Sequence, residues 1–317
     1  MSGSPILLAM VEESLRGMEA LGEGLSEHQI IKVSEQPPDK VFHGVRYAMV
    51  WKPDRQLFSR LPDLEVLFSI GAGVDHIFRA EFVPDVPIVR FVDHTLTTRM
   101  SEWVCLQCLM HLRQQRAYDT RQRQRDWHEF TQPQASEITV GIMGLGVLGQ
   151  DAARKLKTLG FNVIGWSRTG KNIEGLETFS QAGLDAFLAR TDFLVGLLPL
   201  TKETTGIFNR DVFSKLHRNR EIASPVFINA GRGGSQVEAD IISCLEDGTL
   251  GGVSLDVFET EPLQSDSPLW GFENAILTPH VAAVSDMGAF GRYVARQIER
   301  HISGQPLENV VDRSLGY

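Results

Sequence analysis

The sequence predicts an α/β protein built from two open parallel sheets. Short apolar stretches alternate with helical patterns between residues 138 and 280, and a second, smaller alternation occupies the first hundred residues. Such alternation is typical of parallel strands joined by helices that cover both faces of a sheet. A chain of 317 residues with 42% hydrophobic content is long enough for two domains.

The first domain is predicted to hold four strands, at residues 6–10, 47–51, 64–70 and 88–90. Residues 71–75 (GAGVD) follow the third of them and are expected to open a helix. The amides at such a helix start would form an anion-binding site. A plain tight turn is the alternative that the sequence leaves open.

The second domain is predicted to hold six strands, at residues 138–143, 161–166, 192–198, 226–229, 253–257 and 275–278. The intervening helices are expected at residues 148–159, 184–189, 210–216 and 237–247, and Gly160 and Gly248 are placed to end the first and the last. No flexible linker separates the domains, so we expect structured connections, a helix at 101–114 and another beginning near Ser285. The predicted boundaries are 1–100 with 285–317, and 101–284.

The glycine motif Gly144-Leu145-Gly146-Val147-Leu148-Gly149 lies between a predicted strand and a predicted helix. In this context two glycines allow a tight turn and close approach to a pyrophosphate, and the third lets the helix pack on the strand. Free amides at the helix start favour the phosphate charge. The motif therefore indicates a dinucleotide site, and the alternative is a structural glycine turn.

The next strand ends in Trp166, Ser167, Arg168 and Thr169, where an NAD-binding turn usually carries an acid. Two hydroxyls and a guanidinium suit a phosphomonoester, so this turn favours NADPH, with NADH possible. An exposed arginine in a polar loop is the alternative.

Composition excludes several classes of protein. No apolar stretch is long enough to cross a membrane, and residues 1–10 lack the features of an export signal, so a cytoplasmic location is expected. Three cysteines do not form a disulfide framework, and the pair with CxxC spacing, Cys105 and Cys108, lies in an apolar helical run. A net charge of −9 disfavours a nucleic-acid partner.

Three strand ends of the second domain carry groups that could do chemistry: Arg232, then Asp256 with Glu259 and Glu261, then His280. Singly they could be a turn cap, solvated acids and a buried imidazole. Ligands of open parallel sheets bind beyond the carboxyl ends of the strands, however, which favours convergence. Arg232 would then clamp a substrate carboxylate, Glu261 would hold His280 in its protonated form, and His280 would deliver a proton as hydride arrives.

The glycine motif, the segment Asn229-Ala230-Gly231-Arg232-Gly233, residues 255–263 (LDVFETEPL) and Thr278-Pro279-His280 together resemble the D-isomer-specific 2-hydroxyacid dehydrogenases. Residues 165–168 (GWSR), 267–270 (SPLW) and 311–317 (VDRSLGY) are similar to the glyoxylate- and hydroxypyruvate-reducing members. The resemblance implies a Rossmann-type dinucleotide-binding domain inserted into a flavodoxin-like substrate domain. It also implies a helix over residues 289–302 that returns to the first domain.

The resemblance assigns roles to individual residues. Arg232, Glu261 and His280 would be the substrate-binding arginine, the supporting acid and the proton donor, and Asp256 would meet the nicotinamide amide. Gly73 and Val74 would offer backbone amides to the substrate carboxylate, and Trp51 would line the pocket. The expected coenzyme contacts are Gly144, Gly146, Val147, Leu148, Gly149, Trp166, Ser167, Arg168, Leu198, Pro199, Ala230, Gly231, Asp256, His280 and Ala282. No metal is expected.

Three functional hypotheses follow. The first is an NADPH-dependent reductase of small 2-keto acids, glyoxylate and hydroxypyruvate foremost, and the second is an NAD-linked relative such as a D-lactate, phosphoglycerate or formate dehydrogenase. The third is a dinucleotide-sensing binding protein of the same fold, which the lack of long polar tails speaks against. The resemblance also implies a homodimer formed through the nucleotide domain. Trp127 could reach a partner subunit or pack locally.

Overall fold

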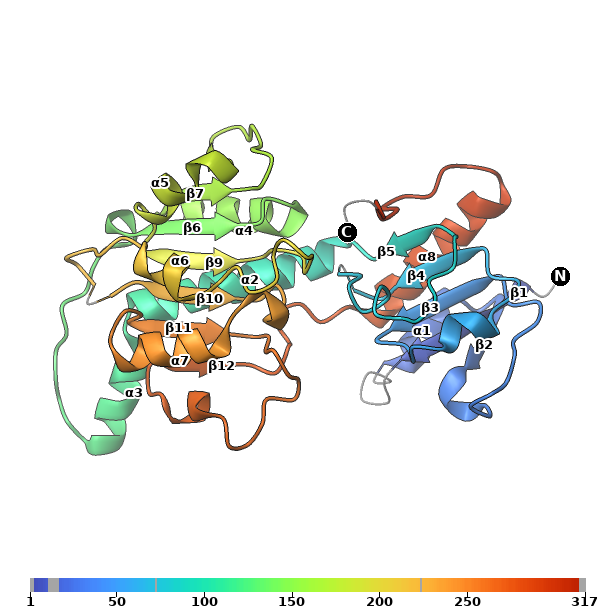
Figure 1. The fold of residues 1–317 in the computed structure, drawn as a ribbon, viewed down its shortest axis with the longest axis horizontal. Helices are drawn as coiled ribbons and strands as arrows, with labels where there is room; N and C mark the ends of the chain where they lie inside the picture. The colour runs from blue at the N-terminus through green and yellow to red at the C-terminus, as the bar shows by residue number, and fades with distance from the viewer. Residues whose placement is uncertain (1–2, 11–16, 72, 223, 314–317) are drawn as a thin grey trace. The chain divides into compact units, whose positions relative to one another are not determined.

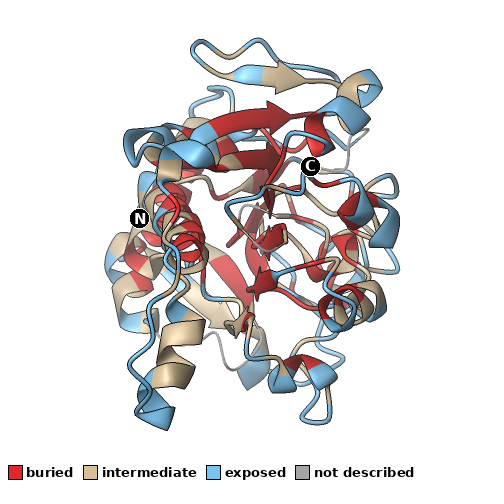
Figure 2. Ribbon diagram, turned by 90° about the vertical axis from the view of Figure 1, so that its left-hand side faces the viewer, coloured by how far each residue is buried: buried red, intermediate tan, exposed pale blue. Residues whose placement is uncertain are grey.

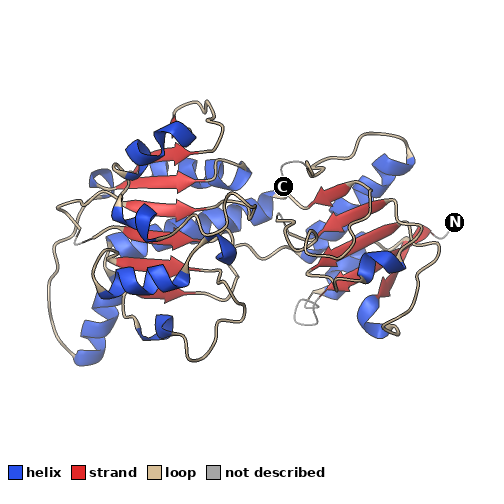
Figure 3. Cartoon of the chain, viewed as in Figure 1, coloured by secondary structure: helices blue, strands red, loops and turns tan. Residues whose placement is uncertain are grey.

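The computed structural model describes residues 3–10, 17–71, 73–222 and 224–313 (Figure 1). Ala72 and the terminal residues 314–317, which carry parts of two predicted motifs, lie outside the described residues. The chain forms two compact units, residues 1–96 with 285–317 and residues 97–284. In each of them helices flank a sheet (Figure 3).

The first unit holds a five-stranded sheet in the order β2-β1-β3-β4-β5. Its strands are β1 (Gly3–Met10), β2 (His28–Lys32), β3 (Tyr47–Trp51), β4 (Val66–Ser69) and β5 (Ile88–Arg90). Every neighbouring pair is parallel. This order is that of the flavodoxin-like sheet and confirms the predicted fold class.

Two helices of the first unit pack closely together, α1 (Met18–Gly24) and α8 (Met287–Ile302). Glycines allow this approach: a Cβ at Gly24 would lie 2.6 Å from the backbone nitrogen of Arg292, and one at Gly291 would lie 2.8 Å from the Leu21 carbonyl oxygen. The buried face of α8 includes Phe290 and Val294. The chain's distant end therefore completes the core of this unit, as the resemblance implied.

The helix predicted to open at residues 71–75 is wrong. Residues 75–79 form turns, closed by bonds from the Ile77 amide to the Val74 carbonyl (2.9 Å) and from the Ala80 amide to the Ile77 carbonyl (3.2 Å). The chain must reach β5 at Ile88 soon afterwards, and Pro84 and Pro87 cannot donate helical hydrogen bonds. The chain therefore turns after Val74 instead of entering a helix.

The second unit holds a seven-stranded sheet in the order β12-β11-β10-β9-β6-β7-β8, with every neighbouring pair parallel. Its strands are β6 (Thr139–Met143), β7 (Asn162–Trp166), β8 (Glu177–Phe179), β9 (Phe193–Gly196), β10 (Val226–Asn229), β11 (Gly252–Leu255) and β12 (Ala275–Leu277). Counted within this unit the order is 3-2-1-4-5-6 with a seventh strand added. This is the Rossmann order, as predicted.

Helices cover both faces of the large sheet, and its strands are the most buried part of this unit (Figure 2). The helices between β5 and β12 are α2 (His94–Leu112), α3 (Gln115–Gln124), α4 (Val147–Thr158), α5 (Leu184–Leu188), α6 (Arg210–Ser214) and α7 (Glu238–Glu246), of which α3 has no buried residue. One apolar cluster joins α2 and α4 to residues such as Val140 and Ile228, and another joins α5, α6 and α7 to residues such as Phe227. Adjacent residues of β10 thus face opposite layers, as in a buried parallel sheet.

Short 3-10 helices connect several elements, at Val33–Glu35, Leu57–Arg60, Ala135–Glu137, Gln181–Gly183, Gly233–Ser235 and Pro268–Gly271. In the described residues no helix is long and apolar enough to cross a membrane. Cys105, Cys108 and Cys244 are free thiols, and burial raises the pKa of Cys105 to about 11.

Candidate active site and coenzyme site

The three glycines after β6 each occupy a position that a side chain would disturb or close. Gly144 has a φ of 114°, and a Cβ there would lie 2.5 Å from the Leu197 carbonyl oxygen. A Cβ at Gly149 would lie 1.9 Å from the Gly144 carbonyl oxygen, so α4 packs directly on the turn. At Gly146 no described atom other than those of its chain neighbours lies within 4 Å of that position. The loop therefore offers open backbone where a pyrophosphate would approach.

The turn after β7 carries a hydroxyl that is buried but has no hydrogen-bond partner among the described residues, Ser167 Oγ. Beside it, Arg168 Nη1 lies 3.8 Å from Glu203 Oε2, and the Arg168 side chain is 42% exposed. Lys171 Nζ donates to the Leu145 carbonyl of the glycine loop (2.9 Å). A buried polar atom without a partner is costly, so Ser167 fits a site that is completed by a ligand.

The loops after β9 and β10 touch one another beside the glycine turn. A Cβ at Gly231 would lie 2.9 Å from the Leu198 carbonyl oxygen, and Leu198 itself is buried. The Pro199 carbonyl accepts from Thr204 Oγ1 (2.6 Å), which fixes the following turn. Ala230 is buried at the end of β10. These predicted coenzyme contacts all lie at the carboxyl edge of the sheet, together with the glycine motif.

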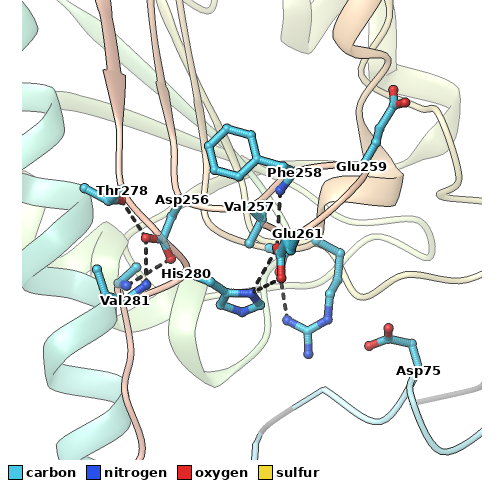
Figure 4. A network of polar contacts seen from close by, with 12 residues as sticks. Asp75, Asp256, Val257, Phe258, Glu259, Glu261, Thr278, His280 and Val281 are labelled. Atoms are coloured by element: carbon cyan, nitrogen blue, oxygen red, sulfur yellow. Dashed lines mark hydrogen bonds and ion pairs between the residues drawn. The ribbon is translucent and has the colours of Figure 1, made fainter. Parts of the chain in front are cut away.

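Glu261 and His280 point toward one another from the loops that follow β11 and β12 (Figure 4). His280 Nδ1 lies 3.0 Å from Glu261 Oε1 and 2.9 Å from Oε2. Both side chains are partly exposed, at 30% for His280 and 21% for Glu261. A carboxylate at this distance accepts a hydrogen bond from Nδ1 and sets the direction of the ring. The pair can therefore hold a proton and present it to a bound molecule.

Asp256 fixes the turn that carries His280. Its carboxylate accepts from Thr278 Oγ1 (2.6 Å), the Val281 amide (2.9 Å) and the Ala282 amide (2.9 Å). Burial raises the pKa of Asp256, and these three bonds oppose that rise. His280 has a φ of 55°, a conformation that costs a non-glycine residue about 1–3 kcal/mol. Asp256 thus stabilises a turn that the His280 backbone alone disfavours.

Arg232 lies on the neighbouring loop, directly before a 3-10 helix. Its Nη1 donates to the Gly231 carbonyl (2.8 Å). Its own carbonyl accepts from Ser235 Oγ (2.5 Å) and from Asn229 Nδ2 (3.3 Å), so the backbone at this position is firmly held. The loops after β10, β11 and β12 are adjacent, because these strands are neighbours in the sheet.

The predicted substrate residues of the first unit lie together at the ends of β3 and β4. A Cβ at Gly71 would lie 2.4 Å from Trp51 Cζ3, so the indole covers the glycine turn that leads to Gly73 and Val74. The Gly73 carbonyl accepts from Ser69 Oγ (3.2 Å). Sequence analysis did not identify His76, whose ring centroid lies 4.8 Å from that of Trp51. A lone histidine in a turn without a motif cannot be recognised from sequence.

Two observations of the structure indicate that the second unit can bind a nicotinamide dinucleotide. Gly146 leaves the glycine turn open, and Ser167 Oγ is a buried polar atom that lacks a partner among the described residues. No group of three or more His, Cys, Asp or Glu residues in the described parts of the chain could hold a metal ion.

Comparisons with known proteins agree with this geometry. The family model described as D-isomer specific 2-hydroxyacid dehydrogenase, NAD binding domain, matches residues 105–282. A glyoxylate/hydroxypyruvate reductase A of Yersinia enterocolitica is 36% identical over 278 residues, which are 86% of this chain and 87% of the relative.

Solved structures give the same result. An NADPH-dependent glyoxylate/hydroxypyruvate reductase of Sinorhizobium meliloti, in complex with NADP and sulfate, is 56% identical with a TM-score of 0.94, and the match covers 99% of this chain and 100% of that one. A D-isomer specific 2-hydroxyacid dehydrogenase of Xanthobacter autotrophicus, in complex with NADPH and MES, is 34% identical with a TM-score of 0.89, over 99% and 100% of the two chains. This chain therefore belongs to the D-isomer specific 2-hydroxyacid dehydrogenase family, whose members are oxidoreductases that use a nicotinamide coenzyme.

Proposed function

We propose that this protein reduces small 2-keto acids with NADPH, glyoxylate to glycolate and hydroxypyruvate to D-glycerate. The observation that carries the proposal is the Glu261–His280 pair at the carboxyl edge of a dinucleotide-binding sheet, next to the loop that carries Arg232. The relatives of Yersinia and Sinorhizobium are named for this reaction.

His280 acts as the proton donor in the proposed mechanism. Its Nδ1 is held by Glu261, so Nε2 is the atom that gives the proton to the substrate oxygen. Arg232 binds the substrate carboxylate through charge-assisted hydrogen bonds and draws electron density from the neighbouring carbonyl. When bound, the nicotinamide coenzyme would supply hydride to the 2-carbon. His280 then takes up a proton from water and is ready for the next substrate.

The coenzyme is proposed to bind along the carboxyl edge of the large sheet. The amides of the glycine motif and the start of α4 hold the pyrophosphate, and Asp256 meets the nicotinamide amide in addition to fixing the His280 turn. Ser167 and Arg168 bind the 2′-phosphate, since the orphaned hydroxyl and the guanidinium both suit a phosphomonoester. Glu203, which neighbours Arg168, would repel that phosphate and moderate the preference for NADPH.

Three further predictions stay proposals. Trp51, Gly73 and Val74 would contact the substrate from the first unit. A homodimer would form through the second unit, where Trp127 is 94% exposed and Leu106 on α2 is 52% exposed. The cytoplasmic location follows from the sparse cysteines of the sequence.

One steady-state comparison tests the function. Specificity constants are measured for glyoxylate, hydroxypyruvate and pyruvate with NADPH and with NADH, by the loss of absorbance at about 340 nm. We expect the largest value for glyoxylate or hydroxypyruvate with NADPH. Faster reduction of pyruvate with NADH would favour the lactate-type alternative, and no consumption with any keto acid would favour the binding-protein hypothesis.

A further inference from the structure

Gln236 is a fully buried amide whose polar atoms are all engaged. Its side chain is 2% exposed, Oε1 accepts from Asn229 Nδ2 (2.8 Å), and Nε2 donates to the Val257 carbonyl (3.0 Å). It also hydrogen-bonds the Glu238 side chain, which partly offsets the rise that burial causes in the pKa of Glu238. Burying an amide is costly unless it is hydrogen-bonded in this way.

The backbone that carries Gln236 is anchored in the core. Its amide donates to the Gly233 carbonyl (3.0 Å), and the flanking residues pair with Phe208 in a parallel bridge. Phe208 is completely buried. The Gln236 side chain therefore extends from a rigid base toward the loop after β11.

A single peptide group connects Gln236 to the proton-donating pair. Gln236 Nε2 donates to the carbonyl of the peptide between Val257 and Phe258. The amide of the same peptide donates to Glu261 Oε1 (3.3 Å; Figure 4). Glu261 in turn holds His280. The polar path thus runs from Gln236 through one peptide plane to the carboxylate and then to the imidazole.

The two loops also touch directly. A Cβ at Gly233 would lie 1.8 Å from the Phe258 carbonyl oxygen, so the loop of Arg232 packs on the loop of Glu261 without space for a side chain. Asn229, which binds Gln236, also donates to the Arg232 carbonyl (3.3 Å). One buried amide pair is therefore in contact with both loops that bear the predicted substrate-binding and acid groups.

We propose that Gln236 is a positioning residue for the Glu261–His280 pair, acting through the Val257–Phe258 peptide. The inference rests on the proposed function. A donor on a peptide carbonyl polarises the amide of the same group and strengthens the bond that it makes. It also fixes the peptide plane, which otherwise can rotate and withdraw the amide from Glu261. Glu261 then holds His280 in one direction, and small errors in such geometry reduce turnover.

The first test replaces Gln236 by methionine, which keeps the length of the side chain but removes both the donor to the Val257 carbonyl and the acceptor of Asn229 Nδ2. We expect kcat for glyoxylate reduction to fall by about tenfold, and the alkaline limb of the kcat profile to move to lower pH. The Kd for NADPH should stay close to that of the parent. Parental kcat together with a parental pH profile would overturn the proposal.

A second variant, Gln236→Glu, has nearly the same shape and can donate only when its carboxyl is protonated. Burial and the neighbouring Glu238 favour the protonated acid. Its kcat, relative to the parent at each pH, should therefore recover as the pH is lowered, whereas that of Gln236→Met should not. Equal pH behaviour of the two variants would contradict the role of the donor.

The matched control is Gln107→Met. Gln107 is also 2% exposed, lies in the same unit on α2, and accepts from Ser254 Oγ (3.0 Å). Its replacement should lower the melting temperature by a similar amount and leave kcat unchanged. A loss of kcat as large as that of Gln236→Met would show a global effect and overturn the proposal.

A readout that does not depend on turnover separates this inference from the proposed function. The His280 Nδ1 proton, bonded to Glu261, should give a downfield proton resonance in the parent and in Gln107→Met. In Gln236→Met the resonance should broaden or move upfield. An unchanged resonance overturns the positioning role, whereas absence of keto-acid reduction by the parent overturns the proposed function alone.

Discussion

Replacing Asp256 by asparagine tests how the structure presents His280. The carboxylate accepts three hydrogen bonds, from Thr278 Oγ1, the Val281 amide and the Ala282 amide, and Asp256 is 1% exposed. Asparagine keeps one acceptor oxygen and turns an NH₂ group toward a backbone amide. One charge-assisted bond is lost and a buried donor is left unsatisfied, which together cost about 2–4 kcal/mol.

The turn at His280 should change conformation first when these hydrogen bonds are weakened, because its φ of 55° is already unfavourable. If the substitution destabilises the turn conformation that presents His280 to the substrate by about 2 kcal/mol, the population of that conformation drops by about thirtyfold. We therefore expect kcat to fall by about thirtyfold, measured with NADPH and glyoxylate. The melting temperature should fall by about 5–10 °C, on the scale for a unit of this size.

Asp192→Asn is the matched control for this change. Asp192 is 1% exposed in the same unit and accepts from the Thr139 amide (2.7 Å) and Asn219 Nδ2 (3.2 Å), and its Oδ1 lies 2.7 Å from His217 Nδ1. It lies at the start of β9, on the opposite edge of the sheet. The Asp192→Asn variant should show a similar fall in melting temperature and keep the kcat of the parent. Equal kcat values in the two variants would refute the reasoning.

Three other predictions use separate features. Arg168→Asp should lower the NADPH-to-NADH ratio of specificity constants by at least about tenfold, since a charge-assisted phosphate contact is lost; an unchanged ratio would assign the 2′-phosphate to another residue. Burial lowers the pKa of His111 to about 4, below its unfolded value, so the unfolded state binds more protons and stability falls as the pH drops from about 6.5 toward 4. In urea unfolding, the free energy of unfolding of the parent should fall by about 2 kcal/mol between pH 7 and pH 5, whereas that of His111→Gln should not. The same fall in both proteins would contradict the role of His111. Trp127→Ala should shift a dimer toward monomer in light scattering, and an unaltered mass would remove the side chain from the interface.

The sequence predicted the buried strands best. The predicted bounds of β3, β5 and β10 coincide with those observed, because each begins with consecutive apolar residues that are buried in the structure. Edge strands β2 and β8 were not predicted. Their residues are mostly half-buried or exposed, so they show no such run.

The helices show the same limit. No residue of α3 is buried, so its sequence has no apolar stripe, and it was not predicted. The incorrect helix after residue 75 came from a local motif alone. The short distance in sequence to β5 decided the outcome, and such a constraint becomes visible only when the sheet is known.

The site divides in a similar way. Arg232, His280 and the two acids Glu259 and Glu261 could be singled out because each follows a predicted strand, and parallel strands bring their ends to one edge. The choice of Glu261 came from the resemblance, since Glu261 directly precedes Pro262. Gln236 could not, since its role depends on a peptide group contributed by another loop. No sequence pattern around Gln236 indicates that contact.

Turnover of a His280→Gln variant tests the central claim most directly. NADPH binding, measured by fluorescence titration, should stay close to that of the parent. The kcat for glyoxylate reduction should fall by about two to four decades, the usual contribution of a general acid. Full turnover with normal coenzyme binding would contradict the account, because His280 would then not be the proton donor.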